Sequence, residues 1–166
     1  MTYESVYEKN AAFYNRHPRA KKILLWSNPL LTGCFFAAYS ALIVYAFCAL
    51  QTWDIVKTLA VPAACLCVVA VLRRIVNRPR PYNEGGSFIV PLTEKDKEGH
   101  SFPSRHLACA FVIIAVAFKY VSWAGWALTP LGLALGYARF ALGLHYPSDL
   151  FVGGVLGGLF GLLLLI

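Results

Sequence analysis

Three clusters of arginine and histidine interrupt an otherwise apolar chain. They extend from Arg73 to Pro81, from Pro103 to His106 and from Arg139 to Asp149. Guanidinium groups carry a permanent charge in a planar fork that can hold two oxygens of one phosphate, and imidazoles can transfer protons near neutral pH. Arginine also stabilises the negative charge that spreads over the oxygens in phosphoryl transfer. The clusters therefore predict a site that binds a phosphate group.

The two histidines of the clusters could divide the work of breaking a phosphate ester, which needs a nucleophile and an acid for the leaving oxygen. Asp149 follows His145 by four residues. Its carboxylate could therefore accept a hydrogen bond from one ring nitrogen and leave the other to attack phosphorus. We predict that His145 is the nucleophile and His106 the general acid. The predicted phosphate ligands from these clusters are Arg73, Arg80, Arg139 and the hydroxyl of Ser104.

Metal ligands are not apparent in the sequence. No spacing of His, Cys and carboxylates is typical of zinc, and 8 Asp and Glu are few for a two-metal hydrolytic site. We therefore expect a metal-independent site with no cofactor. The five cysteines all fall in apolar runs, and we interpret them as small buried apolar residues: Cys34, Cys48, Cys65, Cys67 and Cys109.

The composition places these clusters in a membrane protein. Hydrophobic residues make up 58% of the 166 residues, whereas an average soluble domain has about 45–50%. A helix that crosses a bilayer needs about 17–25 residues. Five apolar runs approach this length: Pro29–Leu50, Ile55–Leu72, Leu107–Val121, Trp123–Leu142 and Leu150–Ile166. We predict an all-α polytopic membrane helical bundle with about five transmembrane helices.

Five crossings bring all three clusters to the same membrane face. Ionisable side chains that face lipid cost several kcal/mol, so we expect them to line a shared polar cavity. Because the arginines lie at the ends of apolar runs rather than on a polar face, we expect the lipid bilayer and a phosphate-bearing substrate as partners, and no nucleic acid. We interpret Arg74 and Arg78 as juxtamembrane residues, and His17 and His100 as structural ones.

Polar segments precede and interrupt the apolar runs. Residues 1–26 contain an amphipathic stripe that includes Val6 and Phe13 and stops at Pro18, which predicts an interfacial helix. The segment 77–102 is rich in Pro and Gly, and we expect it to frame the entrance to the site. In the last run, glycines recur at every fourth residue, which predicts close packing against another helix.

Together the clusters resemble the three-part signature of the type 2 phosphatidic acid phosphatase superfamily. The matching residues are Arg73 with Arg80-Pro81, then Pro103-Ser104-Arg105-His106, then Arg139 with His145 and Asp149. The resemblance implies an all-helical core, a phosphohistidine intermediate at His145, and protonation of the leaving group by His106. It also implies a lipid phosphate substrate, with undecaprenyl pyrophosphate, phosphatidylglycerophosphate and phosphatidic acid as candidates. We therefore divide the chain into an amphipathic segment, 1–26, and a transmembrane phosphatase domain, 27–166.

Three positions depart from the family pattern. Arg73 stands where lysine is usual, Arg105 where glycine is common, and Ala138 where a serine often precedes the arginine. We include Arg105 among the predicted phosphate ligands, although it could instead shape the mouth of the pocket. These departures affect the expected substrate preference rather than the reaction.

The same residues fit three functions: hydrolysis of a lipid phosphate, transfer of the phosphate to another lipid, or binding of anionic lipids without catalysis. Sidedness also has two interpretations. Four basic residues between Arg16 and Lys22 favour a cytoplasmic amino-terminal end. The resemblance to bacterial relatives favours an active site on the outer side of the bacterial cytoplasmic membrane, which is the placement we predict.

Overall fold

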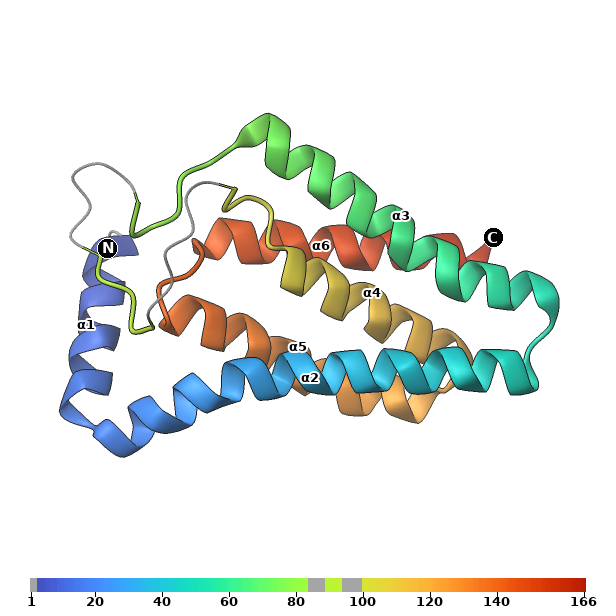
Figure 1. Ribbon diagram of the computed structural model, residues 1–166, viewed down its shortest axis with the longest axis horizontal. Helices are drawn as coiled ribbons and strands as arrows, with labels where there is room; N and C mark the ends of the chain where they lie inside the picture. The colour runs from blue at the N-terminus through green and yellow to red at the C-terminus, as the bar shows by residue number, and fades with distance from the viewer. Residues whose placement is uncertain (1–2, 84–88, 94–99) are drawn as a thin grey trace.

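The computed structural model describes residues 3–83, 89–93 and 100–166. Within these ranges the chain is helical and contains no strand. The elements are α1 (Tyr3–Arg16), α2 (Pro18–Ala49), α3 (Thr52–Val76), α4 (Arg105–Tyr120), α5 (Ser122–Ala141), α6 (Pro147–Leu162) and the short 3₁₀ helix η1 (Leu163–Leu165). Helices α2 to α6 run up and down along one direction, and α1 lies across one end of them (Figure 1). The predicted all-α bundle is confirmed.

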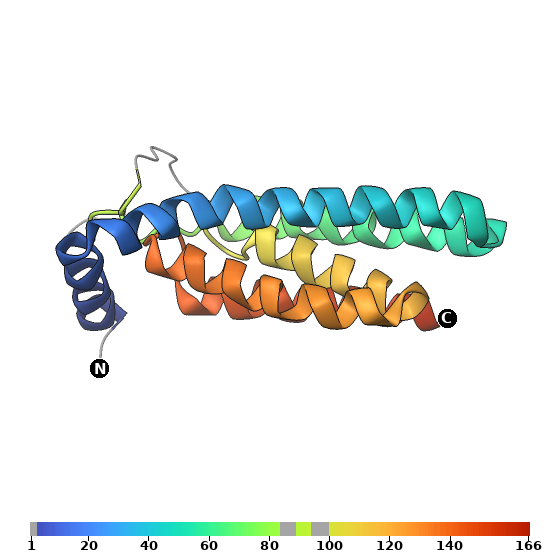
Figure 2. The ribbon, with the colours of Figure 1, turned by 90° about the horizontal axis from the view of Figure 1, so that it is seen from below.

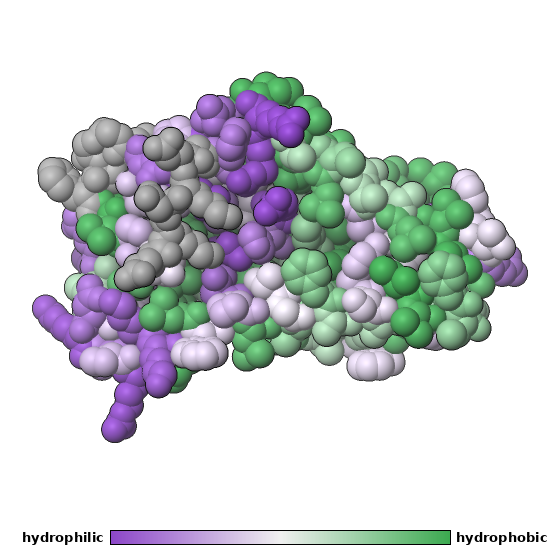
Figure 3. Space-filling model, viewed as in Figure 1, coloured by the Kyte–Doolittle hydropathy of each residue, from purple (hydrophilic) through white to green (hydrophobic). Residues whose placement is uncertain are grey.

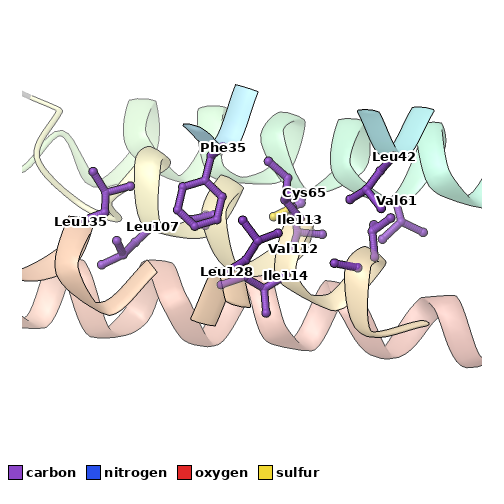
Figure 4. Packing of buried hydrophobic residues seen from close by; sticks show 14 of the residues in the cluster. Phe35, Leu42, Val61, Cys65, Leu107, Val112, Ile113, Ile114, Leu128 and Leu135 are labelled. Atoms are coloured by element: carbon purple, nitrogen blue, oxygen red, sulfur yellow. The ribbon is translucent and has the colours of Figure 1, made fainter. Parts of the chain in front are cut away.

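The bundle is built around α4. Helices α2 and α3 lie on one side of it and α5 and α6 on the other (Figure 2). Opposite faces of α4 are buried because it contacts all four of these helices. Val112 and Ile113 of α4 pack with Phe35 of α2, Cys65 of α3 and Leu128 of α5 (Figure 4). Because α4 is held by all four neighbouring helices, the residues at its amino-terminal end have a fixed position.

The first membrane helix begins earlier than the apolar run that predicted it. Helix α2 starts at Pro18 rather than near Pro29, so residues 18–28 continue it into the polar end. Proline suits a first helical turn, where its missing N–H would have no partner within the helix. Three helices are long and apolar enough to cross a membrane by themselves: α2, α3 and α6 with its extension to Leu165.

The outer surface of the bundle is apolar. Large side chains such as Phe36, Phe47 and Phe151 are about two-thirds or more exposed. Hydrophilic residues gather toward the end that carries α1, and most of the remaining visible face is hydrophobic (Figure 3). The interpretation of the cysteines as buried is wrong for Cys48 and Cys67, which are exposed on this apolar surface. The protein is an integral membrane protein.

Glycines let α6 approach α4 closely. A β-carbon added at Gly153 would lie 2.5 Å from the backbone oxygen of Ser104, and one at Gly157 would lie 2.4 Å from that of Ala108. At Gly161 it would meet the β-carbon of Ala115 at 2.3 Å. The predicted close packing is confirmed, and it places the first turn of α6 against the start of α4.

Helix α1 is fastened to the polar end of the bundle. The Tyr7 hydroxyl donates a hydrogen bond to the Val90 carbonyl oxygen (2.7 Å), and the Asn10 side-chain amide donates one to the carbonyl oxygen of Ala141 at the end of α5 (3.0 Å). Tyr7 is 2% exposed and packs against Gly143, whose φ of 73° suits a residue without a β-carbon. Phe13 remains half-exposed. The predicted amino-terminal helix lies across this end of the membrane helices (Figure 1).

Candidate functional site

The three clusters meet at the end of the bundle that carries α1. Two backbone hydrogen bonds join them: Ser101 N–H donates to the Arg78 carbonyl (2.9 Å), and Ser104 N–H donates to the Asp149 carbonyl (2.9 Å). The first bond joins the two ends of the 77–102 segment. The second ties the start of α4 to the first turn of α6. Residues 84–88 and 94–99 of this segment lie outside the described residues, and with them that part of the expected entrance to the site.

His145 lies in the short turn between α5 and α6 and is 2% exposed. Its Nδ1 is 3.6 Å from Oδ2 of Asp149, which is 0% exposed. This separation is longer than a hydrogen bond. The hydroxyl of Ser101 lies beside both groups: it donates to Oδ2 of Asp149 and is 3.4 Å from Nδ1 of His145. The predicted histidine–aspartate pair is therefore brought together, with a serine oxygen next to it.

Burial lowers the pKa of His145, because an imidazolium is poorly solvated inside the protein. Asp149 acts in the opposite direction, whereas Arg80 and Arg139 lower the pKa of His145 further. The net direction is downward, which favours the neutral ring. A neutral imidazole has a lone pair on one nitrogen, which is the form that a nucleophile requires.

Arg80 and Arg139 are buried cations, 8% and 5% exposed. Arg80 donates from Nη1 to the carbonyl oxygen of Leu144 (3.3 Å). Within the described ranges, Nε of both arginines and Oγ of Ser104 are buried without a hydrogen-bond partner, and no carboxylate lies within salt-bridge distance of either guanidinium. Burying a cation without a counter-ion is costly. These groups are arranged to receive an anion.

Arg73 and Arg105 add two further positive charges. Arg73 is partly buried and donates from Nη1 to the carbonyl oxygens of Pro103 (2.9 Å) and Ser101 (3.3 Å), so it also holds the segment that leads into α4. Arg105 is exposed at the start of α4. Arg80 and Arg105 are each close enough to repel Arg73 and Arg139 electrostatically. The four predicted arginine ligands thus repel one another, and a bound phosphate would reduce this repulsion.

His106 stands at the boundary between this polar site and an apolar cavity. The cavity has a volume of about 330 Å³ and lies among α2, α3, α4 and α5. Arg105 and His106 line one end, and the other lining residues include Phe35, Leu66 and Ile113. The cavity therefore continues from the charged end into the apolar body of the bundle.

Two residues of the site were missed. The interpretation of Arg78 as a juxtamembrane residue is wrong, because its Nη1 donates to Oδ1 of Asp149 at 3.0 Å. Ser101 received no role at all. Both belong to the connection between α3 and α4. The hydropathy of such a segment does not indicate which of its side chains point toward the site. The position of Arg78, two residues before the predicted ligand Arg80, is a feature of the sequence that could have indicated its role in the site. His100 and His17 contact the backbone carbonyls of Arg73 and Phe13, respectively.

Fold and site together define a helical membrane protein with a cluster of buried arginines and a histidine–aspartate pair at one end of its bundle. The sequence model of the PAP2 superfamily matches residues 51–166, which include all three clusters. The chain therefore belongs to the PAP2 superfamily, the type 2 phosphatidic acid phosphatases that its signature resembles.

Two curated proteins are similar in sequence. The chain is 32% identical over 95 residues to a lipid A 4′-phosphatase of Bacteroides thetaiotaomicron, which covers 54% of this chain and 42% of that protein. It is 38% identical over 58 residues to the bacitracin transport permease protein BcrC of Bacillus licheniformis, covering 35% of this chain and 29% of that protein. The chain thus spans less than half the length of either relative.

Two crystal structures share the fold. LpxE of Aquifex aeolicus superposes with a TM-score of 0.64 and 24% identity, over 87% of this chain and 93% of that one. A PAP2-type phosphatidylglycerolphosphate phosphatase of Bacillus subtilis superposes with a TM-score of 0.69 and 22% identity, over 98% and 82%. The arrangement of helices is therefore shared across members that differ widely in sequence.

Proposed function

We propose that this protein hydrolyses a phosphate monoester or diphosphate of a membrane lipid through a phosphohistidine intermediate. The observation that carries the proposal is the pair of buried guanidinium groups, Arg80 and Arg139, whose unpartnered donors lie beside the His145–Asp149 pair. A structural ion pair would bring a carboxylate to such cations. A phosphate-binding site leaves them for the substrate.

In the proposed first step, Nε2 of His145 attacks phosphorus. A nitrogen–phosphorus bond forms while the bond from phosphorus to the leaving oxygen breaks, and His106 gives that oxygen its proton. In the second step water attacks phosphorus and gives a proton to His106, and inorganic phosphate leaves as the nitrogen–phosphorus bond breaks. The arginines would stabilise the charge on the transferring group in both steps. Because they supply this charge, we expect activity in the presence of a chelator.

The apolar cavity beside His106 supports a lipid as the substrate. A head group bound by the arginines would leave its hydrocarbon close to a cavity lined by Phe35, Leu66 and Ile113. The similar proteins named for lipid A and phosphatidylglycerolphosphate point to the same class of compound. We propose undecaprenyl pyrophosphate, phosphatidylglycerophosphate and phosphatidic acid as candidate substrates, acted on at the outer side of a bacterial cytoplasmic membrane.

The test is phosphate release by the purified protein in detergent from each candidate lipid. His145→Ala should abolish release, and His106→Ala should slow it strongly. Parent rates in both variants would contradict the mechanism. Turnover that depends on an added lipid acceptor would identify a phosphotransferase with the same intermediate. If no phosphorylated histidine can be trapped and no phosphate is released from any of these lipids, the chain binds anionic lipids without catalysis.

A further inference from the structure

The carboxylate of Asp149 is held on both oxygens. Oδ1 accepts a hydrogen bond from Nη1 of Arg78 (3.0 Å), and Oδ2 accepts one from the Ser101 hydroxyl and one from the backbone N–H of Tyr146 (3.2 Å). Asp149 is fully buried, so water does not compete for these bonds. The carboxylate cannot rotate without breaking several of them at once.

Ser101 determines what Nδ1 of His145 faces. The single proton of its hydroxyl is donated to Asp149, so the serine oxygen can only accept from a third group. Nδ1 of His145 lies 3.4 Å from that oxygen and 3.6 Å from Oδ2 of Asp149. Both neighbours are acceptors, which keeps the ring proton on Nδ1 and the lone pair on Nε2. Ser101 is itself fully buried and fixed by its backbone bond to Arg78.

Arg78 approaches the carboxylate from the other side. Its guanidinium lies 3.9 Å from the centre of the Tyr146 ring, and its Nη1 also donates to Oγ of Ser148 at 2.9 Å. These contacts are made to the first turn of α6 and to the residue that precedes it. Stacking and hydrogen bonding together fix the plane of the guanidinium.

We propose that Ser101 and Arg78 are positioning residues for His145: Ser101 selects the ring tautomer with the proton on Nδ1, and Arg78 locks the carboxylate that supports it. Their effect on catalysis rests on the function proposed above. The tautomer of His145 does not depend on that function, and it can be measured without turnover.

The first experiment is ¹⁵N NMR of the full chain in detergent with labelled histidine side chains. The chain has four histidines, and loss of one pair of ring-nitrogen signals in His145→Gln assigns His145. We expect a protonated Nδ1 in the parent above pH 7 and a mixture of tautomers in Ser101→Ala. A parent ring protonated on Nε2, or an unchanged His145 signal in Ser101→Ala, would overturn the role of Ser101, whether or not the protein turns over lipid phosphate.

The second experiment separates positioning from phosphate binding in Arg78. We expect Arg78→Ala to lower kcat about 10- to 100-fold, the equivalent of one charged hydrogen bond, with unchanged KM and an unchanged inhibition constant for inorganic phosphate. Arg78→Lys should recover part of kcat. Arg74→Ala removes the neighbouring exposed charge and should retain the parent kcat.

A rise in the phosphate inhibition constant that matches the loss of kcat/KM would make Arg78 a phosphate ligand and overturn its positioning role. If Arg78→Ala has the same kcat as the parent protein, the positioning role is also overturned. If Arg78→Ala does not fold, the same comparison of kcat with the phosphate inhibition constant applies to Arg78→Lys.

Discussion

Burial acts on the histidine and on the arginines of the site in different ways. An imidazole responds to burial by giving up its proton, and the lowered pKa of His145 records this response. A guanidinium cannot lose its proton under ordinary conditions, so Arg80 and Arg139 remain charged. The same dry environment therefore produces a neutral nucleophile beside fixed cations. That combination suits the attack of a nitrogen lone pair on an anionic phosphate.

The lowered pKa of His145 predicts the pH dependence of the reaction. The neutral ring is the reactive form, so kcat/KM should fall only as the pH drops below about 6.5, the ordinary value for histidine. Asp149→Asn removes the group that raises the pKa of His145, and the acid limb should then move to still lower pH. Comparing the two profiles with one substrate cancels the ionisation of the substrate itself. An acid limb that moves to higher pH in Asp149→Asn would contradict this prediction.

Replacement of Arg139 should have opposite effects on activity and on stability. Arg139→Met removes a transition-state donor, and we expect kcat/KM to fall about 10²- to 10³-fold. It also removes a buried cation that lacks a carboxylate partner among the described residues, so the free energy of unfolding should rise by about 1 kcal/mol or more. Enzyme assays and thermal unfolding in detergent measure the two effects. Arg19→Ala, which changes an exposed arginine far along the chain from the clusters, should alter neither. Loss of stability in Arg139→Met would indicate a structural role instead.

At the level of the helices, the site depends on how closely α6 can approach α4. The hydrogen bond from Ser104 N–H to the Asp149 carbonyl spans these two helices, and Gly153 packs against the same serine. A larger residue on this face of α6 would push its first turn, and with it Asp149, away from the start of α4. The geometry of the polar end is therefore set partly by glycines within the apolar part of the bundle.

Two adjacent glycines allow this packing to be tested. Gly157→Ala would place a methyl group 2.4 Å from the Ala108 carbonyl oxygen, whereas an added β-carbon at Gly158 has nothing within 4 Å. We expect Gly157→Ala to lower the free energy of unfolding by about 1–3 kcal/mol. Gly158→Ala should leave it unchanged or slightly raised, because alanine favours a helix. Equal stability of the two variants in thermal unfolding would contradict the packing described here.

The five helices of the bundle could be predicted from the sequence because each of them contains a long apolar run, and a bilayer leaves such a run few alternatives to a helix. The boundaries of the helices were predicted less well than the helices themselves. Helix α2 begins eleven residues before Pro29, since polar residues near the interface continue a helix without changing the hydropathy that reveals it. The contacts of Arg78 and Ser101 were not predictable for a different reason. They depend on the path of an irregular segment, which no periodicity records.

For the molecule as a whole, an odd number of crossings places the amino-terminal helix and the site on one side and the carboxyl end on the other (Figure 1). The basic residues from Arg16 to Lys22, at the end of α1 and the start of α2, favour a cytoplasmic location, whereas we expect the site to face outward. These two expectations conflict, because both groups lie at the same end of the molecule. The exposed Arg16, Arg19 and Lys22 are not among the arginines of the site, so the positive-inside preference applies to them directly. We propose the outward-facing site, and a labelling measurement tests it.

Cysteine labelling in intact cells provides that measurement. In a background that lacks the five native cysteines, Val90→Cys marks the site end, where Val90 is 75% exposed. Gln51→Cys marks the exposed turn between α2 and α3 at the opposite end. A membrane-impermeant maleimide should label Val90→Cys at once and Gln51→Cys only after permeabilisation. The reverse pattern would place the site in the cytoplasm.

The contacts made by Tyr7 and Asn10 also affect how this protein should be handled. Tyr7 fills the space beside Gly143, two residues from His145, and Asn10 bonds the last residue of α5. Trimming the chain ahead of α2 would expose the turn that carries His145 to solvent or lipid. An affinity tag therefore belongs at Ile166, which is 87% exposed and lies at the far end of the molecule.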